Sequence, residues 1–531
     1  MQQCDRNTME HFGVISPVLM ERAALKVFEK ILELTGDKDT GILILCGTGN
    51  NGGDGLALAR LLFLAGYRTV CVYPGKREKA SPEGARQLQI AENYKIPIYA
   101  DLPDGQYGIV VDALFGIGLS RPVEGIYRQL IEACNEQKAI RVAVDIPSGI
   151  DTDTGQVLGT AFRADHTVTF GFAKVGQMLY PGAEYCGSLT VADIGIDEYS
   201  LLDIPADIRL VTKEDLQILP KRRPDGNKGT CGKIAIFAGS RNMAGAAILA
   251  ARAAYASGAG LVMVVTPEEN RIILQTSVPE AILTTFCTGE EQTEAAERML
   301  AWADAIVAGP GIGKGEAARA MLGRILDGHA KHPGVPLVLD ADALNLMAAE
   351  PSLFDHLIGC CVLTPHPGEM SRISGLSIAD IQKNPVSVAK RFANRYNSIV
   401  IQKDARTVTA LPDGSVFINS SGNDGMATGG SGDVLSGILG CLLASASKAA
   451  GRPSGMSEIP AEGLTAALAV CLHGAAGDLA ARKKGRHGMT AADLIPALAE
   501  CLRLVETADD RSETADMRRQ MRGHAKRRII E

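Results

Sequence analysis

The chain has 531 residues, of which 46% are apolar and 22% are charged, and its net charge at pH 7 is −7. This length is more than one ordinary hydrophobic core accommodates, so two or more globular domains are expected. The negative charge balance gives no reason to expect a nucleic-acid partner, and without a run of about eighteen apolar residues the sequence predicts no membrane span.

The first half of the chain is expected to be an α/β domain. Residues 8–35 are predicted to form a helix, because apolar residues recur at helical spacing from Ile15 to Ile31. Short apolar runs then alternate with helical intervals, which is typical of a mostly parallel sheet with helices on both faces. The predicted strands are residues 42–46, 69–73, 109–112, 140–145 and 167–170.

A polar stretch with prolines, residues 196–223, interrupts this alternation and predicts a domain joint. The alternation then restarts, so the second half is also expected to be an α/β domain. A hairpin is predicted at residues 407–419, around the turn Pro412-Asp413-Gly414. The other predicted strands are residues 233–238, 261–266, 305–308, 337–339, 361–363 and 399–402, and Ala-rich helices at residues 463–482 and 491–505 follow them.

The twelve cysteines contain no Cys-x-x-Cys pair. Their spacing argues against a zinc site or a disulfide framework and for a reducing compartment. The first residues do not place a basic segment before an apolar core, so no signal peptide is expected. The sequence therefore predicts a cytoplasmic protein.

Polar residues follow three predicted strands of the first half. A glycine loop, residues 47–55, follows the first strand and leads into a helical pattern, which is an arrangement that presents backbone N–H groups to a phosphate. The loop lacks the Lys-Ser or Lys-Thr of a Walker motif. Asp112 or Asp145 alone could simply cap a loop or a helix. Carboxyl ends of parallel strands share one edge, however, so together these side chains predict a site for a hard cation and a proton-transfer base. The polar residues concerned are Asn50, Asn51 and Asp54, then Asp112, then Asp145, Ser148 and Asp151.

This half resembles the NAD(P)H-hydrate epimerase family over residues 1–207, and the resemblance implies a Rossmann-like αβα sandwich. The matching segments are Leu19-Met20-Glu21-Arg22-Ala23, residues 49–55, residues 111–116 and Asp145-Ile146-Pro147-Ser148-Gly149. The resemblance implies that Asn51, Asp112 and Ser148 bind K⁺ and that Asp145 acts on C6 of a hydrated nicotinamide nucleotide. The residues implied to bind this nucleotide are Asn50, Asn51, Gly52, Gly53, Asp54, Gly116, Ile117, Gly118, Leu119, Ser120, Arg121, Pro122 and Asp145.

A second glycine cluster, residues 422–433, ends in a single carboxylate, Asp433, where a helical pattern begins. Backbone N–H groups in such a loop can approach an anion, and the helix N-terminus adds positive partial charge. A carboxylate at this place makes sense if Asp433 deprotonates a hydroxyl while the loop holds a transferring phosphoryl group. A glycine-rich turn with a helix cap is the simpler alternative, and it explains a twelve-residue run poorly.

The second half resembles the ribokinase-like fold and, within it, the ADP-dependent NAD(P)H-hydrate dehydratases, over residues 208–505. The matches are Lys228-Gly229-Thr230, Pro365-His366-Pro367-Gly368-Glu369 and residues 422–433. Three positions depart from the family pattern: Asp404 replaces a usual glycine, Asp424 a usual proline and Ser431 a usual threonine. The charge of Asp404 is expected to change how tightly the nucleotide binds. Residues 506–531 are expected to form a charged, frayed tail.

The second resemblance implies a catalytic base, Asp433, and ADP bound together with Mg²⁺ as the co-substrate. The residues implied to line the hydrate pocket are Ala246, Gly311, His366 and Asp433, and those implied to contact the nucleotide are Lys403, Asp404, Ala405, Arg406, Thr407 and Gly432.

Taken together, the two resemblances imply an enzyme that repairs hydrated NADH and NADPH. The first half would interconvert the R and S hydrates, and the second would use ADP to dehydrate the S hydrate, releasing AMP and phosphate. We expect small-molecule substrates, a homo-oligomer, and neither nucleic acid nor membrane as a partner. One alternative is a ribokinase-type vitamin kinase fused to a nucleotide-binding domain, which leaves the first half unexplained. Another is a nucleotide-binding regulatory protein with decayed sites, which would have no need of Asp145 and Asp433.

Overall fold

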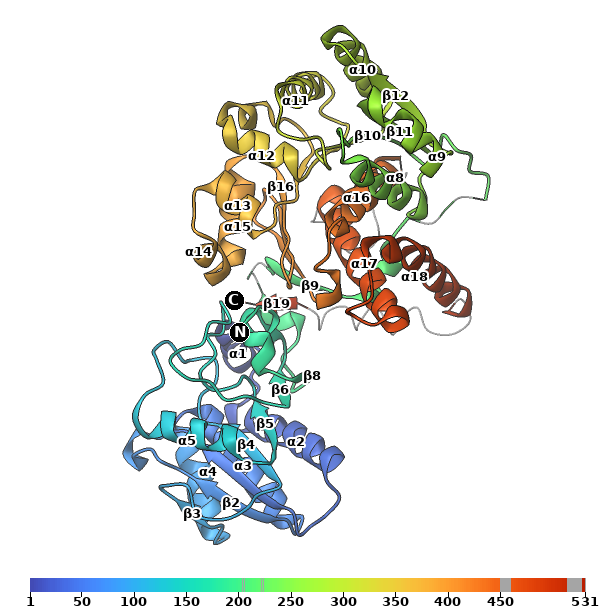
Figure 1. Ribbon diagram of the computed structural model, residues 1–531. Helices are drawn as coiled ribbons and strands as arrows, with labels where there is room; N and C mark the ends of the chain where they lie inside the picture. Colours follow the sequence, from blue (N-terminus) through green and yellow to red (C-terminus); the bar gives the residue numbers. More distant parts are fainter. Residues whose placement is uncertain are drawn as a thin grey trace. The chain divides into compact units, whose positions relative to one another are not determined.

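The computed structural model describes the chain apart from residues 203, 205, 221, 223, 449–459, 513–527 and 531. The chain forms two compact units and passes from the first to the second between Arg209 and Leu210 (Figure 1). The expectation of an α/β protein is confirmed, because each unit contains a largely parallel sheet with helices packed on it.

The first unit is built on a parallel sheet with the strand order β3-β2-β1-β4-β5-β6-β8. This is the order of a Rossmann-like sheet, in which the chain reverses its direction of travel between β1 and β4. The strands are β1 (Gly41–Cys46), β2 (Arg68–Val72), β3 (Ile98–Tyr99), β4 (Ile109–Ala113), β5 (Ile140–Val144), β6 (His166–Phe170) and β8 (Ser188–Ala192), and β7 (Ala173–Lys174) lies outside this sheet.

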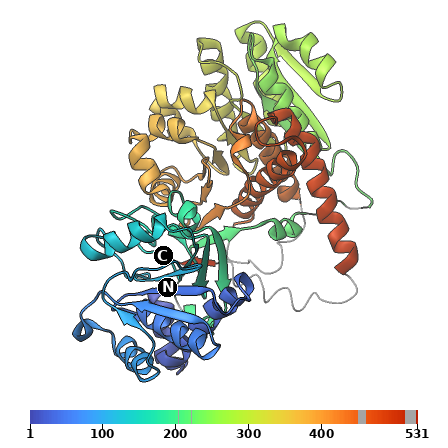
Figure 2. The same cartoon turned by 60° about the horizontal axis from the view of Figure 1, so that its bottom comes forward.

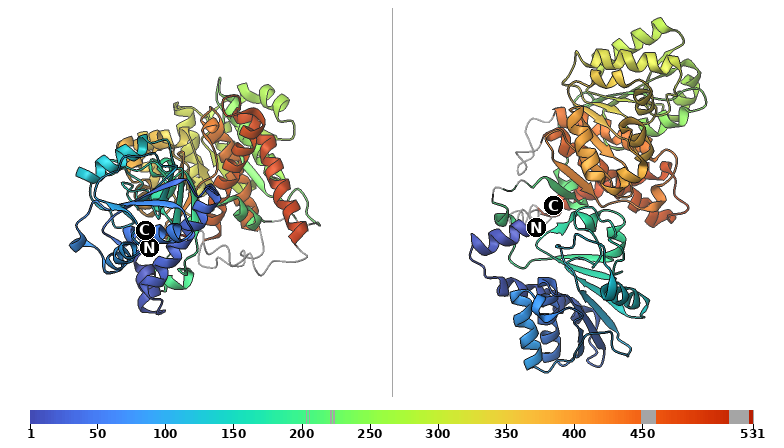
Figure 3. Two further views of the ribbon diagram at one scale, coloured as in Figure 1. Left: turned by 90° about the horizontal axis from the view of Figure 1, so that it is seen from below. Right: turned by 90° about the vertical axis from the view of Figure 1, so that its left-hand side faces the viewer.

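Helices cover both faces of this sheet (Figure 3). Alternate residues of β1 point to opposite faces, so Ile42 and Ile44 pack with α2 and α3, whereas Leu43 and Leu45 pack with α5. This gives the unit a hydrophobic core on each side of the sheet. The helices are α1 (Gln2–Glu10), α2 (Ser16–Leu34), α3 (Asn50–Leu64), α4 (Pro82–Asn93), α5 (Gly125–Glu136), α6 (Val175–Met178) and α7 (Gly182–Tyr185).

The single helix predicted over residues 8–35 is wrong at its start. The chain forms two helices here, α1 and α2, with a break between Glu10 and Ser16. Gly13 lies in the break with φ +76°, a conformation outside the right-handed helix, and Pro17 fits the first turn of α2. The prediction followed the apolar spacing of α2 and missed these two signals.

The second unit has the strand order β12-β11-β10-β13-β14-β15-β16-β17-β18. The strands from β12 to β16 pair in parallel, and β17 and β18 form the predicted antiparallel hairpin. The strands are β10 (Lys233–Phe237), β11 (Leu261–Pro267), β12 (Ile282–Phe286), β13 (Ala305–Ala308), β14 (Leu337–Leu339), β15 (Cys361–Leu363), β16 (Ile399–Gln402), β17 (Val408–Ala410) and β18 (Val416–Asn419).

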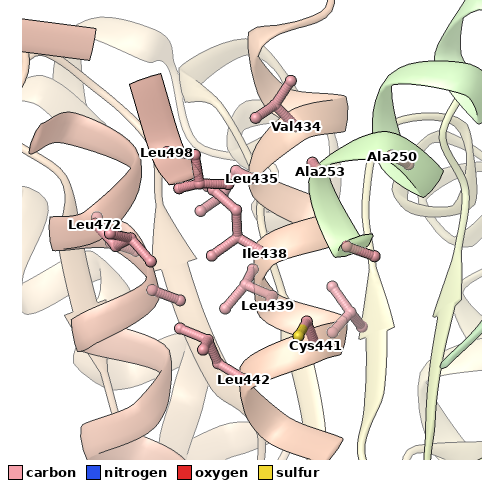
Figure 4. Packing of buried hydrophobic residues seen from close by; sticks show 14 of the residues in the cluster. Ala250, Ala253, Val434, Leu435, Ile438, Leu439, Cys441, Leu442, Leu472 and Leu498 are labelled. Atoms are coloured by element: carbon pink, nitrogen blue, oxygen red, sulfur yellow. The ribbon is translucent and has the colours of Figure 1, made fainter. Parts of the chain in front are cut away.

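The long helices α16 (Ser431–Lys448), α17 (Ala461–Lys484) and α18 (Ala491–Ser512) lie side by side and pack on the sheet together with α8 (Ala244–Ala256) (Figure 2). Figure 4 shows the apolar residues that they share, with Ile438 and Leu439 of α16 in the centre. A Cβ at Gly437 would lie 2.1 Å from the carbonyl oxygen of Ala250, so α16 can approach α8 this closely only with glycine there. The remaining helices are α9 (Arg271–Ser277), α10 (Gly289–Trp302), α11 (Glu316–His329), α12 (Asp342–Ala349), α13 (Pro367–Ser374), α14 (Ile378–Lys383) and α15 (Pro385–Arg395).

The C-terminal region, residues 506–531, begins inside α18, which continues to Ser512. Farther on, β19 (Arg528–Ile530) pairs with β7 and with residues of β9 (Ile208–Val211). Among the described residues, α17 is the one helix long and apolar enough to cross a membrane, and 83% of its apolar window is buried inside the protein, as in the core helix of a folded domain.

Candidate active sites

The first candidate site lies where β1 and β4 end, at the point where the strand order of the first unit reverses. A Rossmann-like sheet opens a crevice at this point, because the loops after these two neighbouring strands lead to helices on opposite faces. The loop after β1 enters α3 at Asn50, so N–H groups of the first helical turn are available to an anion. The loop after β4 contains residues 114–122.

A cavity of about 540 Å³ occupies this crevice. Hydrophobic side chains of α1, α2, β6 and the segment after β8 enclose it, and Met9, Leu19 and Met20 are among them. The sequence-predicted residues that line it are Asn50, Asn51, Asp54, Gly116, Ile117, Gly118, Leu119, Ser120, Arg121 and Asp145.

Three other predicted substrate residues, Gly52, Gly53 and Pro122, do not line this cavity. The two glycines instead allow neighbouring atoms to pack closely against the start of α3, where a side chain would not fit. A Cβ at Gly52 would lie 1.8 Å from the carbonyl oxygen of Gly47, and one at Gly53 would lie 2.5 Å from the terminal methyl group of Met20.

Asp145 is the carboxylate at the end of β5. Its φ of +64° is unusual for a residue other than glycine. Its Oδ1 accepts hydrogen bonds from the Thr169 hydroxyl at 3.0 Å and from Lys174 Nζ at 2.5 Å. The described hydrogen bonds of this carboxylate all end on Oδ1, so Oδ2 is available to a molecule in the cavity.

Sequence reasoning missed Lys174, which also lines the cavity and whose side chain is only 1% exposed. A signal for it exists: Lys174 is the single charged residue in the apolar run Phe170–Gly176. A charged residue in such a run is buried and needs a partner, since an unpaired buried charge is costly. The partner is Asp145, 29 residues earlier in the chain.

Two more carboxylates line the same cavity, Asp5 from α1 and Asp54 from α3. Burial, together with the neighbouring charges of Asp145 and Asp5, raises the pKa of Asp54 well above its usual range. Burial also raises the pKa of Asp5 to about 6, although the charge of Lys174 opposes this shift. The cavity therefore combines an acidic cluster with one buried ammonium group.

The three predicted metal ligands, Asn51, Asp112 and Ser148, are all buried around residues 114–116. Asp112 Oδ1 accepts the Ser148 hydroxyl and its Oδ2 accepts Ser148 N–H, both at 2.7 Å. Ser148 Oγ in turn accepts Phe115 N–H at 2.9 Å. The Asn51 amide lies against Gly116, where a Cβ would be 3.5 Å from Asn51 Oδ1.

This ligand set suits a cation of low charge density. No ion pair of Asp112 occurs in the described part of the chain, and burial raises the pKa of its carboxyl to about 6 despite the hydrogen bonds from Ser148 and Leu114. The Asn51 amide nitrogen is buried and finds no hydrogen-bond partner among the described residues. One carboxylate, one amide and one hydroxyl are oxygen donors that a monovalent cation accepts.

The second candidate site lies at the carboxyl ends of the parallel strands in the second unit. Lys403 follows β16, and its Nζ lies 2.6 Å from Oδ1 of Asp340, which follows β14. Asp340 Oδ2 accepts the hydroxyl of Ser436, from α16, at 2.7 Å. Burial opposes ionisation of Asp340, but Lys403 and Ser436 hold its pKa below the usual value.

Asp433 is the third residue of α16, which begins at Ser431, earlier than the predicted helical run. In the first turn of α16, Ser431 N–H and Val434 N–H donate to backbone carbonyl oxygens, so the N–H groups of Gly432 and Asp433 are the ones available to an anion among the described residues. Burial, followed by the like charge of Asp340, raises the pKa of Asp433 to about 7. Gly432 lies beside the Lys403–Asp340 pair, since a Cβ there would be 3.4 Å from Lys403 Nζ.

Ala246 and Gly311 come together, as predicted: a Cβ at Gly311 would lie 2.8 Å from that of Ala246. His366 is the N-cap of α13, where its Nδ1 accepts Gly368 N–H at 3.0 Å. Its ring is half exposed, and burial together with the charge of Lys403 lowers the pKa of the imidazole. His366 therefore lies near Lys403, with its ring oriented by the hydrogen bond from Gly368.

The segment 404–407 connects β16 to β17. Asp404, the departure from the family pattern, binds its own loop: its carboxylate accepts Ala405 N–H at 2.7 Å, and its carbonyl accepts the Thr407 hydroxyl at 3.2 Å. Arg406 donates to the Ser420 carbonyl oxygen at 2.6 Å. Sequence reasoning missed the contribution of Ser436, because its contact with Asp340 joins residues 96 positions apart.

Known proteins match both units. A family model described as NAD(P)H-hydrate dehydratase matches residues 234–500, and one described as YjeF-related protein N-terminus matches residues 16–176. The bifunctional NAD(P)H-hydrate repair enzyme Nnr of Thermofilum pendens is 38% identical over 82% of this chain and 85% of its own length. The enzyme of the same name from Escherichia coli K12 is 36% identical over 83% of each chain.

Solved structures match the second unit. A ribokinase-like superfamily protein from Enterococcus faecalis V583 is 29% identical, with a TM-score of 0.48, over 56% of this chain and 96% of its own. An ADP/ATP-dependent NAD(P)H-hydrate dehydratase from Bacillus subtilis, co-crystallised with ATP and Mg²⁺, is 28% identical, with a TM-score of 0.47, over 56% of this chain and 99% of its own.

Proposed function

The chain belongs to the family of bifunctional NAD(P)H-hydrate repair enzymes, and on this premise we propose how its two sites divide the repair of hydrated NADH and NADPH. The first unit is the epimerase and the second the dehydratase. The domain boundaries that we propose for them are residues 1–207 and 208–505. Because of this family membership, we adopt this function instead of the two alternatives, a vitamin kinase and a regulatory protein.

The dehydratase proposal is supported most directly by the position of Asp433, a carboxylate in the first turn of α16. The hydrate carries a hydroxyl on C6, and hydroxide is a poor leaving group. Asp433 takes the hydroxyl proton while that oxygen attacks the β-phosphorus of ADP, so AMP leaves and a phosphate ester forms. Phosphate then leaves C6 and a proton leaves C5, so the double bond between these carbons forms and the reduced nicotinamide ring is restored. A base with a pKa of about 7 is well matched to neutral pH.

The other dehydratase residues have supporting roles. Ala246, Gly311 and His366 line the hydrate pocket with Asp433. Lys403, Asp404, Ala405, Arg406, Thr407 and Gly432 contact the nucleotide. Amides at the start of α16 hold the transferring phosphoryl group. Among the described residues no group of three His, Cys, Asp or Glu side chains could hold a metal ion. Mg²⁺ would therefore enter with ADP, bound mainly by phosphate oxygens and water.

For the epimerase, we assign the reacting role to Asp145, which lines the cavity and whose Oδ2 accepts no hydrogen bond from the described residues. Residues 50–54 and 116–122 bind the hydrated nucleotide. Asp145 takes the proton of the C6 hydroxyl as the bond between C6 and the ring nitrogen opens, and returns it when the ring closes on the other face of the resulting carbonyl carbon. Asn51, Asp112 and Ser148 would hold K⁺, which would supply positive charge beside the substrate loop that begins at residue 114. The support is the donor chemistry: one buried carboxylate without an ion-pair partner in the described residues, next to neutral oxygens.

We further propose that the enzyme is a homo-oligomer in the cytoplasm. Four apolar residues of the α2 region, Ile15, Val18, Leu25 and Leu32, are 37–62% exposed. Their spacing places them on one helical face, opposite the buried face, where a solvated helix carries polar residues. A second copy of the chain is the occupant that we assign to this stripe. All twelve cysteines are free thiols, which supports a reducing compartment.

One coupled assay tests the division of labour. The purified protein is given a mixture of both hydrate epimers, with or without ADP, and the absorbance of the reduced nicotinamide ring is followed. Full conversion of the mixture with ADP, and epimer exchange without net dehydration in its absence, are expected. Conversion that stops when one epimer is exhausted would contradict an active epimerase unit.

A further inference from the structure

Asp145 is held in its unusual conformation by one buried segment at the start of α6. Lys174 Nζ donates to its side-chain Oδ1 at 2.5 Å, and Gln177 Nε2 donates to its backbone carbonyl oxygen at 2.6 Å. Gln177 Oε1 also accepts Lys174 N–H at 2.8 Å, so the two clamping residues fix each other. Both are buried, with exposures of 1% and 2%. The main chain and the side chain of Asp145 are therefore immobilised together.

The ammonium group of Lys174 is fully used. Besides Asp145 Oδ1 it donates to the Thr169 hydroxyl at 2.6 Å and to the Phe170 carbonyl oxygen at 3.1 Å. Three acceptors for three N–H groups are what a charged lysine requires. The Thr169 hydroxyl in turn donates a hydrogen bond to Asp145 Oδ1 at 3.0 Å. Lys174, Thr169 and Asp145 therefore form a triangle of hydrogen bonds. This triangle occupies Oδ1, whereas Oδ2 accepts no hydrogen bond from the described residues, and Asp145 lines the cavity.

The charge of Lys174 also matters for the cavity as a whole. Asp5 and Asp54 line it together with Asp145, so three carboxylates share one partly enclosed space. Burial and the neighbouring carboxylates raise the pKa of Asp5 and of Asp54, and the ammonium group of Lys174 opposes this shift at Asp5. The lysine is nearly inaccessible, so its action on a bound substrate runs through Asp145.

We propose that Lys174 is a positioning residue of the epimerase: with Thr169 it occupies Asp145 Oδ1 and aims Oδ2 at the C6 hydroxyl of the hydrate. The inference rests on the proposed role of Asp145. A residue that positions the reacting group acts on the chemical step and leaves substrate binding largely unchanged.

The test is the Lys174→Met variant, which keeps most of the side-chain volume and removes all three donors. Its kcat for epimer interconversion should fall about a hundredfold, which is the loss expected for a misplaced reacting group, while KM changes little. Dehydration of the S hydrate by the same protein should be unchanged. A wild-type kcat, or a raised KM with an unchanged kcat, would overturn the assignment.

Thr169 offers a matched pair of variants that keeps the inference testable if Lys174→Met does not fold. Thr169→Val removes the bridging hydroxyl and should lower kcat for epimerisation at constant KM, and Thr169→Ser, which keeps that hydroxyl, should restore it. Equal kcat values for the two variants would overturn the inference. Asp145→Ala, measured alongside, separates the two levels: an inactive Asp145→Ala with a fully active Lys174→Met refutes only the role of Lys174, whereas an active Asp145→Ala refutes the proposed role of Asp145 itself.

Discussion

Lys403 and Asp340 form an ion pair, with Nζ 2.6 Å from Oδ1, in which the carboxylate is buried and its second oxygen accepts the Ser436 hydroxyl. The pair ties the ends of β16 and β14 to the first turns of α16. Asp433 lies in the field of both charges: Asp340 raises its pKa and Lys403 lowers it. The carboxylate that we propose as the base of the dehydratase thus lies within a network of fixed charges.

We predict that Asp433→Asn abolishes dehydration and leaves epimerisation intact. Loss of a general base typically costs between about a hundredfold and ten-thousandfold in rate. Dehydration is measured with ADP and the S hydrate, and epimer exchange by chromatographic separation of the two hydrates. Asp424 is an exposed carboxylate in the same loop, so Asp424→Asn is the matched control. This variant should keep most of the dehydratase activity. Near-wild-type turnover in Asp433→Asn would show that Asp433 is not the base and only ends the loop at the start of α16.

Asp433 should also make stability depend on pH. Its pKa rises from 3.8 to about 7 on folding, so between these values the native state binds more protons than the unfolded state. Stability contributed by this group is therefore lost as pH rises through that window. Asp433→Asn removes the cost of ionising this buried carboxyl group. The variant should therefore stabilise the second unit by on the order of 2 kcal/mol at pH 8, with little effect at pH 4. Thermal unfolding at the two pH values measures this, and an equal effect at both would contradict it.

Asp145→Ala should stop epimer interconversion without slowing dehydration of the S hydrate. The two activities use separate units, so removing one reacting group should leave the other activity untouched. Asp151→Ala is the control, because that carboxylate accepts hydrogen bonds from Thr154 and does not line the cavity. Loss of both activities in Asp145→Ala would mean that they share one site.

A rubidium- or thallium-soaked crystal should show a single anomalous peak near Asp112, Asn51 and Ser148, at long metal–oxygen distances. In solution, K⁺ should raise the thermal unfolding midpoint of the first unit more than Na⁺ does, because a larger ion matches these neutral oxygens better. Asp112→Asn should remove that difference. A compact six-coordinate site at magnesium distances would refute the assignment.

Leu25→Glu should shift the protein towards the monomer in sedimentation velocity, because it places a charge in the centre of the apolar stripe on α2. Lys26→Glu changes charge at the next position, off the stripe, and should leave the assembly unchanged. A wild-type protein that sediments as a monomer at all concentrations would end the proposal.

The central strands could be predicted from the sequence because buried parallel strands are apolar throughout; β1, β4 and β13 are buried at every position. Three of the strands that were not predicted, β3, β8 and β12, lie at sheet edges, where partial burial weakens the apolar signal. The same distinction holds for the sites. Residues that follow strands could be grouped by topology, whereas Lys174 and Ser436 are recognised only through partners distant in the chain.

The contact between Gly437 and Ala250 has a consequence for catalysis. The two helices that meet there each carry, near the N-terminal end, one residue of the proposed dehydratase site: Ala246 on α8 and Asp433 on α16. The distance between α16 and α8 at this contact therefore determines the distance between Ala246 and Asp433 in the proposed site. The missing side chain of Gly437, buried below the site, therefore determines how wide the proposed site is.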